Sequence, residues 1–169
     1  ADFIETKECY EIALETKAPA IFALSRQNTP QLRKTTTKNL SRKGGYIISK
    51  EHNEQNLQIT IFATGTEVDI ALQVQNILQA ENISIRVCSV PSMCILLKQP
   101  HDYIQSLKGN ANKIVAIEAG VEFGWHKVIG ESGVFFGMHQ FGASAPSGEL
   151  YKFFNLTKEH IAQQLSKLI

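Results

Sequence analysis

The longest regular pattern of apolar and polar positions covers residues 57–93 and predicts a strand, a helix and a second strand. An apolar, β-rich run ends at the turn Thr64–Thr66, and apolar positions then recur at helical spacing up to Leu78. A second short apolar run follows at residues 83–90. Because a helical crossover returns the chain to the same end of a sheet, we expect the two strands to be parallel.

The segments on either side of this unit predict the rest of an α/β domain. Further strands are predicted at residues 46–48, 113–118 and 133–136, and further helices at residues 100–107, around residues 125–128, at 148–154 and after Thr157. The last strand lies close enough to its predecessor to allow an antiparallel edge. The pattern therefore predicts a doubly wound, mostly parallel five-stranded sheet with one antiparallel edge strand and helices on both faces.

The N-terminal residues predict half of another α/β unit. Asp2 and Glu5 have the spacing of a capping box, in which the aspartate accepts from free amides and the glutamate reaches back to the cap. The helix is expected to run to about Lys17, and residues 20–24 are typical of a buried strand. Residues 27–45 are polar and basic without an acidic or aromatic residue, which favours a solvated connector over a surface on which bases could stack.

Composition and charge exclude several classes of protein. The 17 Lys and Arg residues nearly balance the 16 Asp and Glu residues, for a net charge of +1, so charge favours neither nucleic acid nor a membrane surface as a partner. No apolar run approaches the roughly 20 residues needed to cross a bilayer. Three cysteines without a CxxC pair favour a reducing compartment. We expect a cytoplasmic protein without a signal peptide, and the start at Ala1 suggests a piece of a longer chain.

Arg26 is the first candidate for chemistry. It follows the predicted strand at residues 20–24, and the carboxyl ends of parallel strands face the binding crevice of α/β domains. Its guanidinium is a forked, permanently charged donor suited to phosphate, although an ordinary surface arginine is an equal interpretation of the position alone. The turn at residues 64–67 could hold an anion at a helix start, but one glycine is far from a nucleotide fingerprint, and a tight turn capped by Thr66 is favoured.

The remaining polar residues form no self-sufficient active site. The histidines are scattered, and none pairs with a cysteine or carboxylate at metal-ligand spacing, so no zinc site is predicted. His126 and His139 could line a cleft, and Glu118 could act as an acid, but structural roles are favoured for all three. No serine lies in a nucleophile elbow and no cysteine has an evident base. We therefore expect no catalytic residue, cofactor-binding residue or metal ligand in this chain.

Several motifs together resemble the C-terminal third of transketolases. They are Ala1–Asp2 with Glu5, Ala23–Asn28, Pro30–Leu32, Gly44–Ile47, Ala63–Val68, Arg86–Val87, Ser89–Ser92, Ile117–Gly120 with Trp125 and Lys127, and Phe141–Pro146. The resemblance runs almost from end to end in order, although Met93–Lys98 departs from it. It implies that residues 1–30 end a pyrimidine-binding domain, that 31–44 are a linker, and that 45–169 are the complete C-terminal domain.

The resemblance also implies a function for the full-length protein. Transketolases are homodimers that use thiamine diphosphate and a divalent cation, Mg²⁺ or Ca²⁺, to move a two-carbon ketol unit between sugar phosphates in the pentose phosphate pathway. Arg26, in the Leu-Ser-Arg-Gln motif, falls where the family places an arginine on the substrate phosphate. The family's metal ligands, activating glutamate and catalytic histidines would lie in domains upstream of Ala1. The chain alone is therefore expected to be inactive and to bind no cofactor, while supplying a phosphate arginine and a domain that supports the dimer.

Two alternatives stay open. The chain could act alone as a small-ligand or regulatory α/β binding module that uses the helix start at Thr66–Glu67. It could also belong to a related thiamine diphosphate enzyme, a deoxyxylulose phosphate synthase or a 2-oxo acid dehydrogenase β subunit. The Leu-Ser-Arg-Gln and Phe-Gly-Ala-Ser-Ala-Pro motifs argue against these related enzymes.

Overall fold

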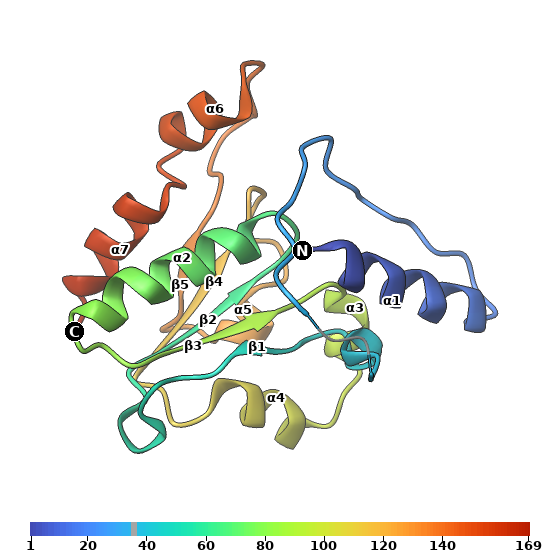
Figure 1. The fold of residues 1–169 in the computed structure, drawn as a ribbon, viewed down its shortest axis with the longest axis horizontal. Coiled ribbons are helices and arrows are strands. Elements are labelled where there is room, and N and C mark those ends of the chain that lie inside the picture. The colour runs from blue at the N-terminus through green and yellow to red at the C-terminus, as the bar shows by residue number, and fades with distance from the viewer. Residues whose placement is uncertain (35–36) are drawn as a thin grey trace.

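The computed structural model describes residues 1–34 and 37–169, and five strands within them form a sheet in the order β1-β3-β2-β4-β5 (Figure 1). The strands are β1 Tyr46–Ser49, β2 Ile59–Ala63, β3 Ile85–Ser89, β4 Lys113–Ile117 and β5 Val134–Phe136. The helices are α1 Phe3–Glu15, α2 Glu67–Ala80, α3 Met93–Leu96, α4 His101–Lys108, α5 His126–Ile129, α6 Ser147–Phe153 and α7 Lys158–Ser166, with 3₁₀ turns η1 Leu40–Lys43 and η2 Glu54–Asn56. The predicted α/β fold is confirmed.

The directions of the strands confirm the predicted βαβ unit. They also show that the antiparallel edge strand is at the other edge of the sheet from the one predicted. Strands β2 and β3 are parallel neighbours, and β4 and β5 continue the parallel set on the other side of β2. The antiparallel strand is β1, which pairs with β3. Strand β5, which the sequence allowed as that edge, is parallel to β4, because the chain crosses back through α5 between the two strands.

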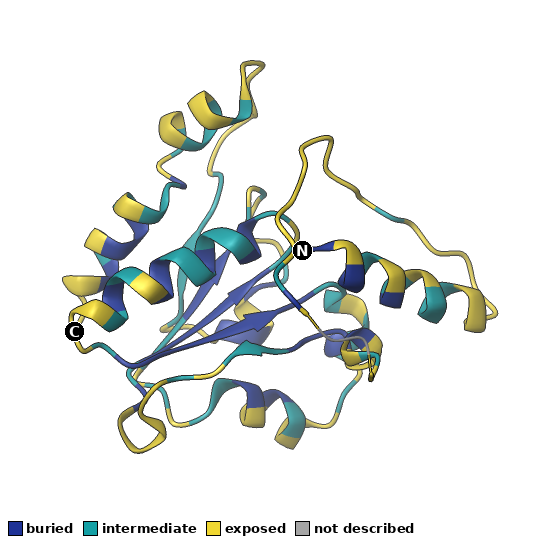
Figure 2. Ribbon diagram, viewed as in Figure 1, coloured by how far each residue is buried: buried dark blue, intermediate teal, exposed yellow. Residues whose placement is uncertain are grey.

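Helices cover both faces of the sheet (Figure 2), and a cluster of buried apolar side chains lies between the sheet and the helices on each face. On one face α2 packs against β2 and β3, and α7 packs against α2, with Leu78 and Leu165 fully buried. On the other face α4 and α5 bring Leu107 and Val128 against Phe62. Strand β2 is buried along its whole length, as expected for a central strand covered on both sides.

The N-terminal helix is capped as predicted, but its glutamate has a different role. An oxygen of the Asp2 carboxylate accepts from the amide of Glu5 over 2.7 Å, and the helix ends at Glu15. The expected bond from Glu5 back to the cap is not formed. Its carboxylate instead accepts from the hydroxyls of Tyr46, over 2.9 Å, and Ser89, over 2.5 Å. Glu5 is buried against the sheet, so nearby donors on the strands satisfy it.

The predicted strand at residues 20–24 is wrong. These residues are neither helical nor extended in a sheet, and the side chain of Ile21 is 97% exposed. A strand needs a neighbouring backbone with which to pair, and no other strand in the described part of the chain lies beside this segment. The ring of Phe22 stacks on Tyr10 of α1 with 4.3 Å between centroids, which holds the segment near the helix.

The connector after this segment is partly buried rather than solvated. Residues 35 and 36, inside the predicted linker at 31–44, lie outside the described residues. Arg33 and Ser41, within the same linker, are both buried. The prediction of a solvated connector is therefore wrong for these two residues, because α1 supplies buried carboxylates to them.

Gly109 ends α4 in a backbone conformation that a side chain would strain. Its φ is +60°, and an added Cβ would lie 2.7 Å from Nη1 of Arg86 and 2.8 Å from Cδ2 of Leu57. Both neighbours are buried, and Arg86 is held by Glu51 and by the carbonyl of Ser106. They therefore have little freedom to move away.

We expect Gly109→Ala to lower the free energy of unfolding by about 1–3 kcal/mol, as strained positive-φ residues do, measured by urea denaturation. The matched control is Gly130→Ala, because Gly130 also has a positive φ of +78° but nothing lies within 4 Å of its added Cβ. The Gly130→Ala variant should lose less free energy of unfolding than Gly109→Ala. Equal losses in the two variants would show that the contacts with Arg86 and Leu57 contribute nothing.

Candidate functional site

A small cavity lies at the carboxyl edge of the sheet, where the connections after the parallel strands meet. Its volume is about 230 Å³, and its walls come from four parts of the chain. Ala119 follows β4, Met138 follows β5, and Tyr151 belongs to α6, while Gln27 comes from the segment that precedes the sheet. This edge is where α/β domains usually bind ligands.

Arg26 directly precedes a residue that lines this cavity, and it belongs to no strand. It occupies a bend in the exposed segment between α1 and the sheet, and the next residue, Gln27, lines the cavity wall. The Arg26 side chain is exposed, so its charged, forked donor set is open to an anion. Arg26 therefore lies on a loop rather than at the end of a strand, and its contact with a phosphate stays a prediction.

The turn before α2 forms a closed hydrogen-bonded cluster with α6. Thr66 stands at the N-cap position, but its hydroxyl makes no capping bond. It donates to Oε1 of Glu67 over 2.6 Å and lies 3.0 Å from the hydroxyl of Tyr151. Tyr151 also donates to Oε1 of Glu67. The side chains at this helix start are therefore engaged with each other.

Burial strengthens the preference of Tyr151 for its protonated form. Loss of solvent, followed by the hydrogen bond to the Glu67 carboxylate, raises the pKa of Tyr151 to about 12. The tyrosine hydroxyl, protonated at neutral pH as any tyrosine is, therefore remains a donor to Glu67 to a higher pH than an exposed tyrosine would. The glutamate is only 5% exposed, so the bond is shielded from water.

Glu118, His126 and His139 are not assembled into a catalytic group. Oε2 of Glu118 accepts from the indole nitrogen of Trp125 over 2.5 Å, the structural role that was favoured for it. His126 and His139 are both exposed. Within residues 1–34 and 37–169, no group of three or more His, Cys, Asp or Glu side chains could hold a metal ion.

Sequence reasoning missed a buried acidic face on α1. Asp2, Glu5 and Glu8 follow one another at a spacing of three residues and are all buried. A carboxylate oxygen of Asp2 accepts from the amide of Arg33 over 2.8 Å, and both oxygens of Glu8 lie 3.1 Å from Nη1 of Arg33. Ser41 also donates to Glu8 over 2.8 Å. The acidic face fastens α1 to the connector and the sheet, and its regular spacing was the available signal.

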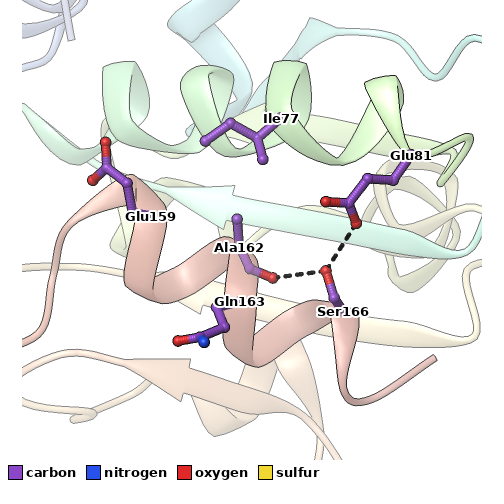
Figure 3. Close-up of a pocket in the computed structure, with 6 residues that line it drawn as sticks. All are labelled: Ile77, Glu81, Glu159, Ala162, Gln163 and Ser166. Atoms are coloured by element: carbon purple, nitrogen blue, oxygen red, sulfur yellow. Dashed lines mark hydrogen bonds between the residues drawn. The ribbon is translucent and has the colours of Figure 1, made fainter.

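A second hollow lies between α2 and α7, with a volume of about 410 Å³ (Figure 3). Ile77 and Ala162 form its apolar part, and Glu81 and Glu159 flank it. The Glu81 carboxylate accepts from the hydroxyl of Ser166 over 3.1 Å. Its lining residues include no nucleophile paired with a base. The hollow is a gap left where the two helices pack against each other.

Comparison with known sequences identifies a family. Residues 44–157 match the transketolase-like C-terminal domain. A transketolase of Sinorhizobium medicae is 43% identical over 172 residues, which cover 100% of this chain and 24% of that protein. The chloroplastic transketolase of Spinacia oleracea is 37% identical over 96% of this chain and 22% of its own length.

Solved structures show the same relationship. A mutant transketolase of Pichia stipitis in complex with xylulose 5-phosphate superposes with a TM-score of 0.87 at 35% identity, over 99% of this chain and 24% of that one. A transketolase of Leishmania mexicana superposes with a TM-score of 0.84 at 36% identity, over 97% of this chain and 23% of that one. The chain thus spans about a quarter of the length of these relatives. None of the helices in the described residues has the length and apolar character to span a bilayer.

Proposed function

This chain belongs to the transketolase family, and on that premise we propose that it is the C-terminal part of a thiamine diphosphate-dependent transketolase. The full-length enzyme would move a two-carbon ketol unit between sugar phosphates in the pentose phosphate pathway, as a cytoplasmic homodimer. In this assignment residues 1–30 end the pyrimidine-binding domain, 31–44 are the linker, and 45–169 are the C-terminal domain. The match of residues 44–157 to the family's C-terminal domain carries the proposal.

Arg26 is the residue of this chain that would contact substrate. It is exposed and permanently charged, and the residue after it, Gln27, lines the cavity at the carboxyl edge of the sheet. A guanidinium binds a phosphate through two parallel, charge-assisted hydrogen bonds. Arg26 would therefore hold the phosphate of the ketose donor or the aldose acceptor, while the other end of the sugar reacts elsewhere in the enzyme.

The cofactor belongs to other parts of the enzyme. The described residues hold no cluster of metal-ligating side chains, so they do not suit the Mg²⁺ or Ca²⁺ that would accompany thiamine diphosphate. We assign both to the upstream domains. In such an enzyme the cofactor supplies the difficult carbon–carbon chemistry, and the protein supplies position and charge.

A reconstitution assay tests this division of labour. The purified 169-residue chain is assayed for ketol transfer from xylulose 5-phosphate to ribose 5-phosphate, with thiamine diphosphate and Mg²⁺ present. We expect no transfer from the chain alone and transfer after the upstream polypeptide is added. Activity of the chain alone would mean that it has its own cofactor site, and no activity from the combined polypeptides would overturn the proposal.

A further inference from the structure

Helix α1 turns an acidic side toward the sheet and most of its apolar side chains away from it. The buried residues of the helix are Ile4, Glu5 and Glu8, whereas Phe3 and Leu14 are exposed. A helix that belonged to this sheet alone would be expected to bury its apolar side chains. The exposed apolar side therefore agrees with the assignment of α1 to the upstream pyrimidine-binding domain.

One carboxylate oxygen of Glu5 joins α1 to two strands of the sheet. Its Oε2 accepts from the hydroxyl of Tyr46 on β1 over 2.9 Å and from the hydroxyl of Ser89 on β3. Tyr46 and Ser89 are partners in the antiparallel register of these strands, so the sheet itself places the two donors side by side. All three residues are buried, and water therefore cannot readily replace the two bonds.

The surroundings of Tyr46 keep its hydroxyl a donor to Glu5. The guanidinium of Arg33 lies 4.9 Å from the centre of the Tyr46 ring. Burial, followed by the charge of Glu5, raises the pKa of Tyr46. The amino group of Ala1 also pairs with Glu5, but through the other oxygen, Oε1. That nitrogen would be a peptide amide in a longer chain, whereas the two hydroxyl bonds do not depend on the terminus.

We propose that Glu5, Tyr46 and Ser89 form a latch between the pyrimidine-binding domain and the C-terminal domain. The inference rests on the function proposed above, because that assignment places Glu5 in the first domain and the two hydroxyls in the second. Removing either hydroxyl leaves a buried carboxylate with fewer donors, which costs more than an ordinary hydrogen bond contributes. The latch therefore couples the two domains, so that they open together.

The test follows native cysteines in the complete enzyme, this chain together with its upstream domains, as urea is increased. Cys9 is partly buried on α1 and Cys88 is buried in β3, so each reports the opening of one of the two domains. Cys94 is exposed and serves as the internal standard. Alkylation by iodoacetamide is measured at each cysteine by mass spectrometry of peptides. In the unchanged enzyme we expect Cys9 and Cys88 to become reactive at the same urea concentration.

Tyr46→Phe removes one hydroxyl of the latch and keeps the ring. In this variant we expect Cys88 to become reactive at about 0.5–2 M less urea than Cys9, the scale for losing one hydrogen bond to a charged group in a domain of this size. Ser89→Ala removes the other hydroxyl and should give the same separation. Midpoints that coincide in both variants, or that already differ in the unchanged enzyme, would overturn the latch.

Thr60→Val is the matched control. Thr60 is also buried, and its hydroxyl donates one hydrogen bond, to the carbonyl of Lys108 over 2.7 Å, but both residues lie inside the C-terminal domain. We expect Cys9 and Cys88 to become reactive together at a lower urea concentration, because the latch is intact. A separation of the two midpoints as large as that in Tyr46→Phe would show a general weakening of the C-terminal domain and would overturn the inference.

The labelling experiment needs no enzyme activity, so its outcome is separate from that of the reconstitution assay. Coinciding midpoints in the two latch variants would overturn the latch and leave the proposed function standing. If the reconstituted polypeptides gave no ketol transfer but the midpoints separated as expected, the proposed function would fall and the coupling of α1 to the sheet through Glu5 would remain.

Discussion

Replacing Glu8 with alanine is expected to lower the free energy of unfolding by about 3–5 kcal/mol, because the change removes the nearer of the two carboxylates that pair with the buried Arg33 guanidinium and leaves only Asp2, 3.8 Å away. Glu8 is 4% exposed and Arg33 is 8% exposed. Both carboxylate oxygens lie 3.1 Å from Nη1 of Arg33, and Ser41 donates to one of them. Water could not replace these bonds without opening the junction between α1 and the connector.

Thermal and urea denaturation measure the loss, and limited proteolysis shows whether α1 detaches before the sheet unfolds. Glu15→Ala is the control. Glu15 lies on α1, as Glu8 does, and forms an ion pair with Arg42 of η1, but both side chains are more than half exposed. We expect little change from it, since solvent screens exposed pairs. A similar loss in both variants would show that burial is not the source of the effect.

The β2–α2–β3 unit could be predicted because its signals are local. Apolar runs and a helical period within a few turns of each other define the elements, and the crossover rule then gives their direction. The position of the antiparallel edge could not be predicted in this way. Pairing of β1 with β3 joins Tyr46 to Ser89 across the sequence, and no local pattern specifies such a partner.

Two other outcomes show what apolar composition leaves out. Residues 20–24 have the composition of a buried strand, but composition does not say whether another backbone lies alongside. For the acidic face of α1 the error is in the other direction, because composition suggests exposure where the structure shows burial. Its glutamates resemble solvated helix residues, and the donors that bury them, such as Arg33 and Tyr46, are distant in the sequence.

In the candidate site, too, the part carried by a local motif could be predicted, and the part that depends on distant segments could not. The Leu-Ser-Arg-Gln motif is a local signal, so Arg26 could be selected from the sequence. The cavity next to it joins Gln27 to Met138 and Tyr151, which come from the far end of the chain. Thr66 was predicted as a helix cap, but its hydroxyl instead contacts Glu67 and Tyr151. Only the folded chain shows that these residues belong together.

In the complete enzyme, Arg26→Ala should raise the KM for phosphorylated sugars by about 10- to 150-fold, because it removes a charge-assisted contact of about 1.5–3 kcal/mol. The KM for unphosphorylated sugars should change little, since they lack the group that the guanidinium binds. The measurement compares ribose 5-phosphate with ribose as acceptor, at a saturating concentration of the same donor.

Two further variants show which property of Arg26 matters. Arg26→Lys keeps the charge but loses the forked donor set, so its KM for ribose 5-phosphate should lie between those of the unchanged enzyme and Arg26→Ala. Arg42→Ala removes another exposed arginine, one that pairs with Glu15, and should leave both KM values unchanged. Equal effects of Arg26→Ala on the two sugars would contradict a phosphate contact, because binding energy lost from the phosphate alone must be absent when the phosphate is absent.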